Sequence, residues 1–112
     1  PIERNVVNEL SDGSALLLVQ KGPNAGARYL LNSDLISVGR NPESDIFLDD
    51  VTVSRKHAQF QRAGSGYAVQ DSGSLNGTYV NGELAERTEL INGDSVQIGK
   101  YRLLYMTNGG KK

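Results

Sequence analysis

The chain has 112 residues, which is long enough for one hydrophobic core and too short for two. It has no cysteine and one histidine, which excludes disulfides and zinc sites of the usual kinds and fits the reducing environment of the cytoplasm. A net charge of −1 argues against nucleic acid or an anionic membrane surface as a partner, and no apolar run approaches the ~20 residues of a membrane span.

The chain opens with a polar segment and then changes character. Residues 1–13 are weakly patterned and end in a turn signal, so we expect a tail there, and the proline at position 1 indicates a processed or trimmed chain. From Ala15 onward, short apolar runs alternate with Gly, Asn, Asp and Pro, which is typical of strands and turns. Residues 107–112 are expected to form a second tail, which leaves 14–106 as the domain. The expected strands lie at 15–20, 27–31, 35–39, 45–48, 57–62, 67–71, 77–80, 94–99 and 101–106.

Short turns connect these expected strands. Asn81-Gly82 is the strongest hairpin signal in the chain. Apolar and polar residues alternate in 57–62 and 94–99, which predicts one buried and one solvent-facing side for each strand. No long segment has the 3.6-residue period, so an extended helix is not expected. Many short strands with frequent turns indicate an all-β sandwich or barrel.

Three polar clusters fall in the expected loops: GRNPESD at 39–45, SRKH at 54–57 and DSGSLNGTYVNG at 71–82. Loops at one end of a β-sandwich meet in space even when they are distant in sequence, and such loops often carry function. If the three clusters meet, they bring together hydrogen-bond donors that suit a phosphate dianion. These donors are the side chains of Arg40, Ser54, Arg55, Ser74 and Asn76 together with loop N–H groups.

Each of these residues also has a simpler interpretation. Arg40 alone and Lys56 fit exposed, solvated cations. Turn chemistry explains both Asn-Gly pairs and is sufficient for Asn81-Gly82. His57, the single histidine, stands where a strand begins, a position more typical of a hydrogen-bonded structural residue than of a catalyst.

An enzyme is the weakest hypothesis. Ser54, His57 and Asp71 could be imagined as a triad, but no Gly-x-Ser-x-Gly elbow is present and two cations next to Ser54 favour anion binding. The glycine-rich stretches match neither a P-loop nor a dinucleotide fingerprint. We therefore expect no catalytic residue, metal site or cofactor.

The motifs resemble a known family when they are taken together. Gly39-Arg40, SRKH at 54–57 and SLNGTYVNG at 74–82 occur in the order and spacing of the forkhead-associated (FHA) domain, which the chain resembles from about Ser14 to Met106. The resemblance implies a two-sheet β-sandwich whose loops at one end bind phosphothreonine peptides.

The resemblance also implies roles for single residues. Arg40 and Ser54 would hold phosphate oxygens, and Arg55 would add a second cation. Leu75 would offer its backbone, and Asn76 would hydrogen-bond the peptide main chain. The expected phosphothreonine-binding residues are thus Arg40, Ser54, Arg55, Ser74, Leu75 and Asn76, with structural support from Gly39, His57 and Gly77.

A closer resemblance concerns the stretches GSALLLVQKGPNAGARYLL and PESDIFLDDVTVSRKHAQF. They are similar to small actinobacterial FHA regulators that inhibit 2-oxoglutarate dehydrogenase. In that subfamily a Ser/Thr protein kinase phosphorylates an N-terminal Thr-Thr motif, and the phosphorylated N-terminal segment then occupies its own FHA site. Residues 1–13 contain no threonine, so the switch segment is either cut away or absent.

Two functions remain open at this stage. One is a regulator of 2-oxoglutarate dehydrogenase or other metabolic enzymes. The other is a generic adaptor that binds phosphothreonine-containing proteins in trans. Both predict a cytoplasmic binding protein without nucleic-acid or membrane partners.

Overall fold

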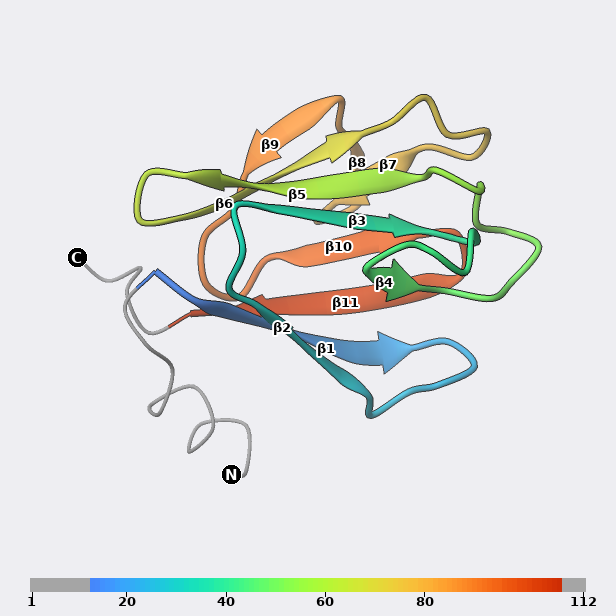
Figure 1. Ribbon diagram of the computed structural model, residues 1–112, viewed down its shortest axis with the longest axis horizontal. Coiled ribbons are helices and arrows are strands. Elements are labelled where there is room, and N and C mark those ends of the chain that lie inside the picture. Colours follow the sequence, from blue (N-terminus) through green and yellow to red (C-terminus); the bar gives the residue numbers. More distant parts are fainter. Residues whose placement is uncertain (1–12, 108–112) are drawn as a thin grey trace.

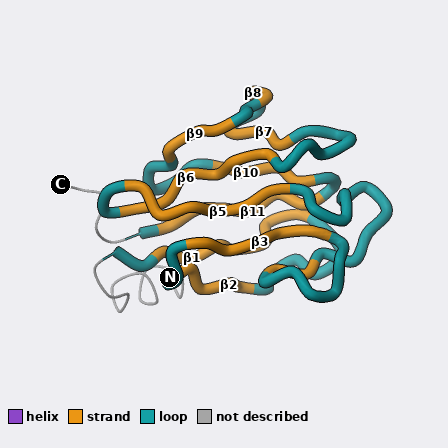
Figure 2. Tube along the Cα trace, turned by 45° about the horizontal axis from the view of Figure 1, so that its top comes forward, coloured by secondary structure: helices purple, strands orange, loops and turns teal. Residues whose placement is uncertain are grey.

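The computed structural model describes residues 13–107, and they form a β-sandwich of two sheets (Figure 1). One sheet has six strands in the order β2-β1-β11-β10-β7-β8, and the other has five in the order β4-β3-β5-β6-β9. The described residues contain only strands and loops (Figure 2). The strands are β1 (Ala15–Lys21), β2 (Arg28–Leu31), β3 (Leu35–Gly39), β4 (Ile46–Phe47), β5 (Ala58–Ala63), β6 (Gly66–Asp71), β7 (Thr78–Val80), β8 (Glu83–Leu84), β9 (Arg87–Glu89), β10 (Ser95–Ile98) and β11 (Tyr101–Met106).

The core lies between the two sheets and explains why these segments form strands. In β5, Ala58 and Phe60 are buried while Gln59 and Gln61 are partly exposed, which confirms the alternation predicted for this strand. Fully burying a large apolar side chain stabilises the fold by about 1.5–3 kcal/mol. The largest apolar side chains with almost no exposed surface come from strands of both sheets and, for Leu48, from the loop after β4; they are Tyr67, Tyr105, Phe60, Leu17, Leu31, Leu48, Ile98 and Leu103.

The all-β prediction and the two-sheet sandwich are confirmed, with two strands that the sequence did not reveal. β8 and β9 are short and mostly exposed, and their residues do not alternate between apolar and polar. β9 forms because its backbone pairs with the edge of β6, where Thr88 lies opposite Val69. The predicted tails, 1–13 and 107–112, lie outside the described residues apart from Gly13 and Thr107.

Turns set the register of neighbouring strands. The predicted hairpin at Asn81-Gly82 is confirmed: Val80 pairs with Glu83 across it, and Asn81 has a φ of 52°, in the left-handed region that Asn tolerates. Unlike the antiparallel strands of this hairpin, β3 and β4 pair in parallel, with Val38 opposite Ile46.

The loops β3–β4, β4–β5 and β6–β7 emerge at the same end of the sandwich, on the right in Figure 1. The β5–β6 hairpin lies at the opposite end. The loops that contain the three polar clusters of the sequence therefore lie at one end of the molecule.

No helix among residues 13–107 is long and apolar enough to cross a membrane.

Candidate functional site

Backbone hydrogen bonds join the β3–β4 and β4–β5 loops. The Arg40 N–H donates to the Ser54 carbonyl over 2.9 Å, and the Asn41 N–H donates to the Arg55 carbonyl over 3.2 Å. Gly39 makes this approach possible, because a Cβ at that position would overlap the Arg55 carbonyl oxygen. The end of β3 thus places Arg40 directly beside Ser54.

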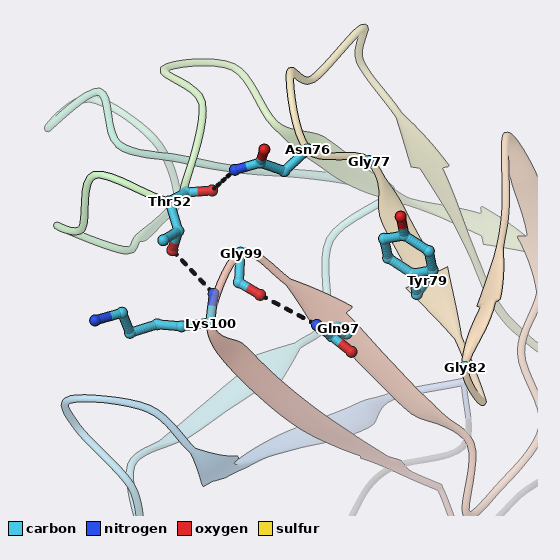
Figure 3. Close-up of a pocket in the computed structure, with 8 residues that line it drawn as sticks. All are labelled: Thr52, Asn76, Gly77, Tyr79, Gly82, Gln97, Gly99 and Lys100. Carbon is cyan, nitrogen blue, oxygen red and sulfur yellow. Dashed lines mark hydrogen bonds between the residues drawn. The ribbon is translucent and has the colours of Figure 1, made fainter.

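The β6–β7 loop, which passes from one sheet to the other, meets the same segment. The Leu75 N–H donates to Ser54 Oγ over 2.9 Å, and Asn76 Nδ2 donates to the Thr52 carbonyl over 3.0 Å (Figure 3). Because Ser54 Oγ accepts from Leu75, its own proton remains free to donate to a ligand. The three predicted loops are therefore in direct contact.

His57 is fully buried and links these loops from below. Its Nδ1 accepts the Ser54 N–H over 3.0 Å, and its Nε2 lies 2.9 Å from the Gly77 carbonyl. Since Nδ1 accepts, the proton of the neutral ring belongs on Nε2, which donates to Gly77. The Ser72 N–H also donates to the His57 carbonyl over 2.9 Å. Both ring nitrogens are thus engaged in holding loops together.

Asp71 organises the β6–β7 loop, a role that the sequence interpretation missed. Its Oδ2 accepts the N–H groups of Gly73 and Ser74, both over 2.9 Å, and its Oδ1 accepts the hydroxyls of Ser74 and Thr78 over 2.5 and 2.7 Å. Burial alone would raise the pKa of Asp71, but these hydrogen bonds outweigh it and lower the pKa. The sequence signal was available, because Asp followed by Ser-Gly is typical of a side-chain-stabilised turn.

The donors left over for a ligand are grouped around Ser54. Arg40 is half-buried and Arg55 is exposed, and neither guanidinium forms a hydrogen bond or ion pair with any residue from Gly13 to Thr107. Asn76 uses one of its two amide protons on Thr52 and keeps its Oδ1. Lys56 is exposed as well and also has no partner among the described residues.

Ser74 and Leu75 differ from the sequence-based expectation. The Ser74 hydroxyl donates to Asp71 and accepts the Gly77 N–H over 2.9 Å, so its proton is already used. The Leu75 N–H is used by Ser54. In this structure both residues therefore use these groups in hydrogen bonds that shape the loop.

The imagined Ser54–His57–Asp71 relay is not formed. His57 contacts the backbone N–H of Ser54 rather than its hydroxyl, and its other ring nitrogen faces Gly77. The Asp71 carboxylate is occupied by its own loop. Residues 13–107 also hold no group of three or more His, Cys, Asp or Glu side chains placed to bind a metal ion.

Thr52 is a second residue that the sequence did not single out. Its hydroxyl donates to Asp50 Oδ2 over 2.6 Å and accepts the Lys100 N–H over 2.9 Å, while its carbonyl accepts Asn76. The hydrogen bonds from Thr52 lower the pKa of Asp50. Thr52 thus ties the β10–β11 turn to the β6–β7 loop, at one wall of an open cavity of about 530 Å³ (Figure 3).

The fold and the site together define a class of protein: a β-sandwich that gathers loop donors at one end to recognise an anionic group. The FHA domain family matches residues 36–99, and the chain belongs to this family.

Two relatives and one solved structure support this assignment. The oxoglutarate dehydrogenase inhibitor of Corynebacterium jeikeium is 58% identical over 95% of this chain and 73% of its own length. The glycogen accumulation regulator GarA of Mycolicibacterium smegmatis is 59% identical over 90% of this chain, which spans 64% of GarA. A solved FHA domain, studied for phosphothreonine-dependent interactions, is 26% identical with a TM-score of 0.77, over 85% of this chain and 97% of its own length.

Proposed function

We propose that the chain binds phosphothreonine in proteins and peptides through the loops around Ser54. The observation that carries the proposal is a pair of arginines, Arg40 and Arg55, whose backbones adjoin Ser54 and whose guanidinium groups have no partner among residues 13–107, together with a Ser54 hydroxyl whose proton is free. Charge-assisted bonds from such groups suit a phosphate with nearly two negative charges. The phosphothreonine-dependent interactions studied for the solved FHA domain favour the same chemistry.

The remaining residues of the site act by positioning these donors or the peptide. Asn76 is assigned to the peptide main chain, because its Oδ1 and one amide proton are available. Ser74 and Leu75 hold the loop and the Ser54 hydroxyl in place. Gly39 and His57 support them from the strand ends.

Calorimetric titration with phosphothreonine, phosphoserine and unphosphorylated peptides of one sequence tests this proposal. Arg40→Ala should lose about 2–5 kcal/mol of binding free energy because a charged hydrogen-bond partner is removed. Arg40→Lys is the matched control: it keeps the charge without the two-pronged donor and should retain part of the affinity. Both variants should melt like the wild type. Undiminished binding by Arg40→Ala would refute the assignment.

We infer that the chain acts through the same surface as a regulator of 2-oxoglutarate dehydrogenase rather than as a generic adaptor. The observation behind this choice is the 58% identity to the C. jeikeium inhibitor, which extends over 95% of this chain. A partner surface rich in acidic groups or backbone carbonyls can use the donors that a phosphate uses. Such a role places the chain in the cytoplasm, under the control of a Ser/Thr protein kinase, as a binding protein rather than an enzyme.

An activity assay with purified 2-oxoglutarate dehydrogenase separates the two roles. The chain should inhibit the enzyme, and excess phosphothreonine peptide should relieve the inhibition because both ligands compete for the Ser54 surface. Arg40→Ala and Ser54→Ala should inhibit less. Phosphopeptide binding without any inhibition would leave the adaptor role. Inhibition that peptide does not relieve would put the enzyme-binding surface elsewhere.

A further inference from the structure

The two sheets differ in how the polar side chains on their outer faces are hydrogen-bonded. On the five-stranded sheet, outward side chains bond one another both within and between strands: Gln61 of β5 donates to Gln59 of the same strand over 2.9 Å and to Gln70 of β6 over 2.6 Å, and Arg87 of β9 contacts both Gln61 and Glu89. Several polar side chains of this face are therefore hydrogen-bonded within the protein. The six-stranded sheet has no comparable network among its outward side chains in residues 13–107.

The six-stranded sheet also concentrates positive charge. Four of its six strands, β2, β1, β11 and β10, lie next to one another and contain no Asp or Glu, although the whole chain has a net charge of −1. Three cations of these strands are exposed and form no hydrogen bond or ion pair within the described part of the chain. We call them the sheet cations; they are Lys21, Arg28 and Arg102.

Two of the sheet cations stand directly opposite each other. After a bulge in β1, Lys21 pairs with Arg102 of β11, and directly paired residues point to the same face of a sheet. Like charges in this arrangement destabilise a sheet. No carboxylate of these strands compensates them, so an acidic ligand would remove a repulsion that the free protein retains.

A row of cross-strand partners connects this pair with the phosphothreonine loops. Arg102 pairs with Gln97, and Gln97 pairs with Tyr79. Gln97 and Tyr79 line the open cavity that Asn76 borders on the loop side (Figure 3). From β7 to β1 the row crosses three strand spacings, about 14 Å, which an extended peptide covers in about four residues.

We propose that the sheet cations form an extended subsite for an acidic stretch of the same polypeptide that carries the phosphothreonine. This inference rests on the proposed function. The phosphothreonine would lie at Ser54, the chain would cross the cavity beside Tyr79, and carboxylates about four to eight residues away would reach Arg102 and Lys21. The site would thus select phosphothreonine peptides with a flanking acidic segment.

Fluorescence anisotropy with labelled phosphothreonine peptides tests the subsite. Each peptide carries about four glutamates or about four glutamines in that window, placed either before or after the phosphothreonine. In one of the two orientations, the glutamate peptide should bind the wild type roughly threefold to tenfold more tightly at low ionic strength, and added salt should abolish the difference. Lys21→Glu and Arg102→Glu should remove the gain while leaving the glutamine peptides unaffected.

Arg87→Glu is the matched control, because it makes the same charge change on an exposed strand arginine of the other sheet. It should keep the gain. Arg102→Glu should melt at or above the wild-type temperature, since it replaces a like-charge pair by an opposite pair. Equal affinity for glutamate and glutamine peptides in both orientations, or a gain that persists in Arg102→Glu, would overturn the subsite. Loss of all phosphopeptide binding by the wild type would instead refute the proposed function.

Discussion

Ser54 and His57 illustrate how single residues share the work of the site. The Leu75 N–H donates to the Ser54 hydroxyl, which leaves the hydroxyl proton free for the proposed ligand. His57 has no exposed surface, and its two ring nitrogens hydrogen-bond the backbone of Ser54 and Gly77. A ligand would contact Ser54 directly, and His57 would affect its binding only through the backbone groups that the imidazole holds.

His57→Ala should therefore lower stability first and affinity as a consequence. It removes hydrogen bonds to the Ser54 N–H and the Gly77 carbonyl, and leaving a buried polar group unpaired costs about 1–3 kcal/mol. His57→Asn is a useful comparison, because its Oδ1 can still accept the Ser54 N–H, so its loss should be smaller. Urea denaturation measures both. A His57→Ala protein with wild-type stability and no phosphopeptide binding would mean that the imidazole contacts the ligand.

Asp71 should make the stability of the protein depend on pH in the acid range. Hydrogen bonds lower its pKa below the ordinary value of 3.8. A group with a lowered folded pKa stabilises the fold above its unfolded pKa and loses that contribution as pH falls through the folded pKa. The difference in unfolding free energy between wild type and Asp71→Asn should thus shrink from about pH 5 to about pH 2. A difference that is constant over this range would show that the ionised carboxylate does not stabilise the loop.

At the level of elements, the sequence revealed the strands that alternate and missed those that do not. Every predicted strand is present to within one or two residues at each end. β8 and β9 escaped because pairing with β7 and β6, rather than any local pattern, makes them strands. The parallel pairing of β3 with β4 was equally invisible, since the chain between them carries only turn signals.

The candidate site also contains some features that the sequence revealed and others that it did not. Short motifs were enough to predict which loops hold Arg40, Ser54 and Asn76. The bracing contacts were not predictable, because they depend on which sheet each loop belongs to. Asp71 bonds within its own loop, but Thr52 joins elements that are far apart in sequence. Ser74 was assigned to the ligand for a different reason: the motif shows that a hydroxyl is present, and only its distance to Asp71 shows that its proton is occupied.

Gly39→Ala should disturb the junction of the β3–β4 and β4–β5 loops. The new Cβ would overlap the Arg55 carbonyl, which is backbone and cannot swing away. We expect Gly39→Ala to be less stable than the wild type. We also expect it to lose more phosphopeptide affinity than Gly64→Ala, because Arg40 and Ser54 are held together at this junction. Gly64→Ala in the β5–β6 hairpin is the control: its φ of 60° costs about 1 kcal/mol, but its Cβ meets open space at the other end of the sandwich. Equal affinity for both variants would contradict the positioning role of Gly39.

At the scale of the whole molecule, the net charge of −1 conceals an uneven distribution. Two acidic side chains near the loops are engaged: Asp71 within its loop, and Asp50 with Thr52 and with Lys100 at 3.5 Å. The guanidinium groups of Arg40 and Arg55 have no such partners among residues 13–107. Local pairing, rather than net charge, thus leaves an anion-binding surface on a slightly acidic protein.

This distribution predicts how affinity for a phosphothreonine peptide depends on pH. Arginine side chains are not deprotonated in proteins, and the lowered pKa of Asp71 keeps its loop intact well below neutrality. The phosphate of the ligand does titrate between about pH 7.5 and about pH 5, because its second pKa is about 6. Protonation removes one negative charge from the ligand, so the dissociation constant should rise as pH falls through this range.

A sulfated peptide provides the control for this titration, because its charge does not change over the same range. Its affinity should stay constant between about pH 7.5 and about pH 5 while that of the phosphopeptide falls. A parallel fall for both peptides would place the titrating group on the protein. Constant affinity for the phosphopeptide would contradict recognition of the dianion, and with it the assignment of two unpaired arginines to the phosphate.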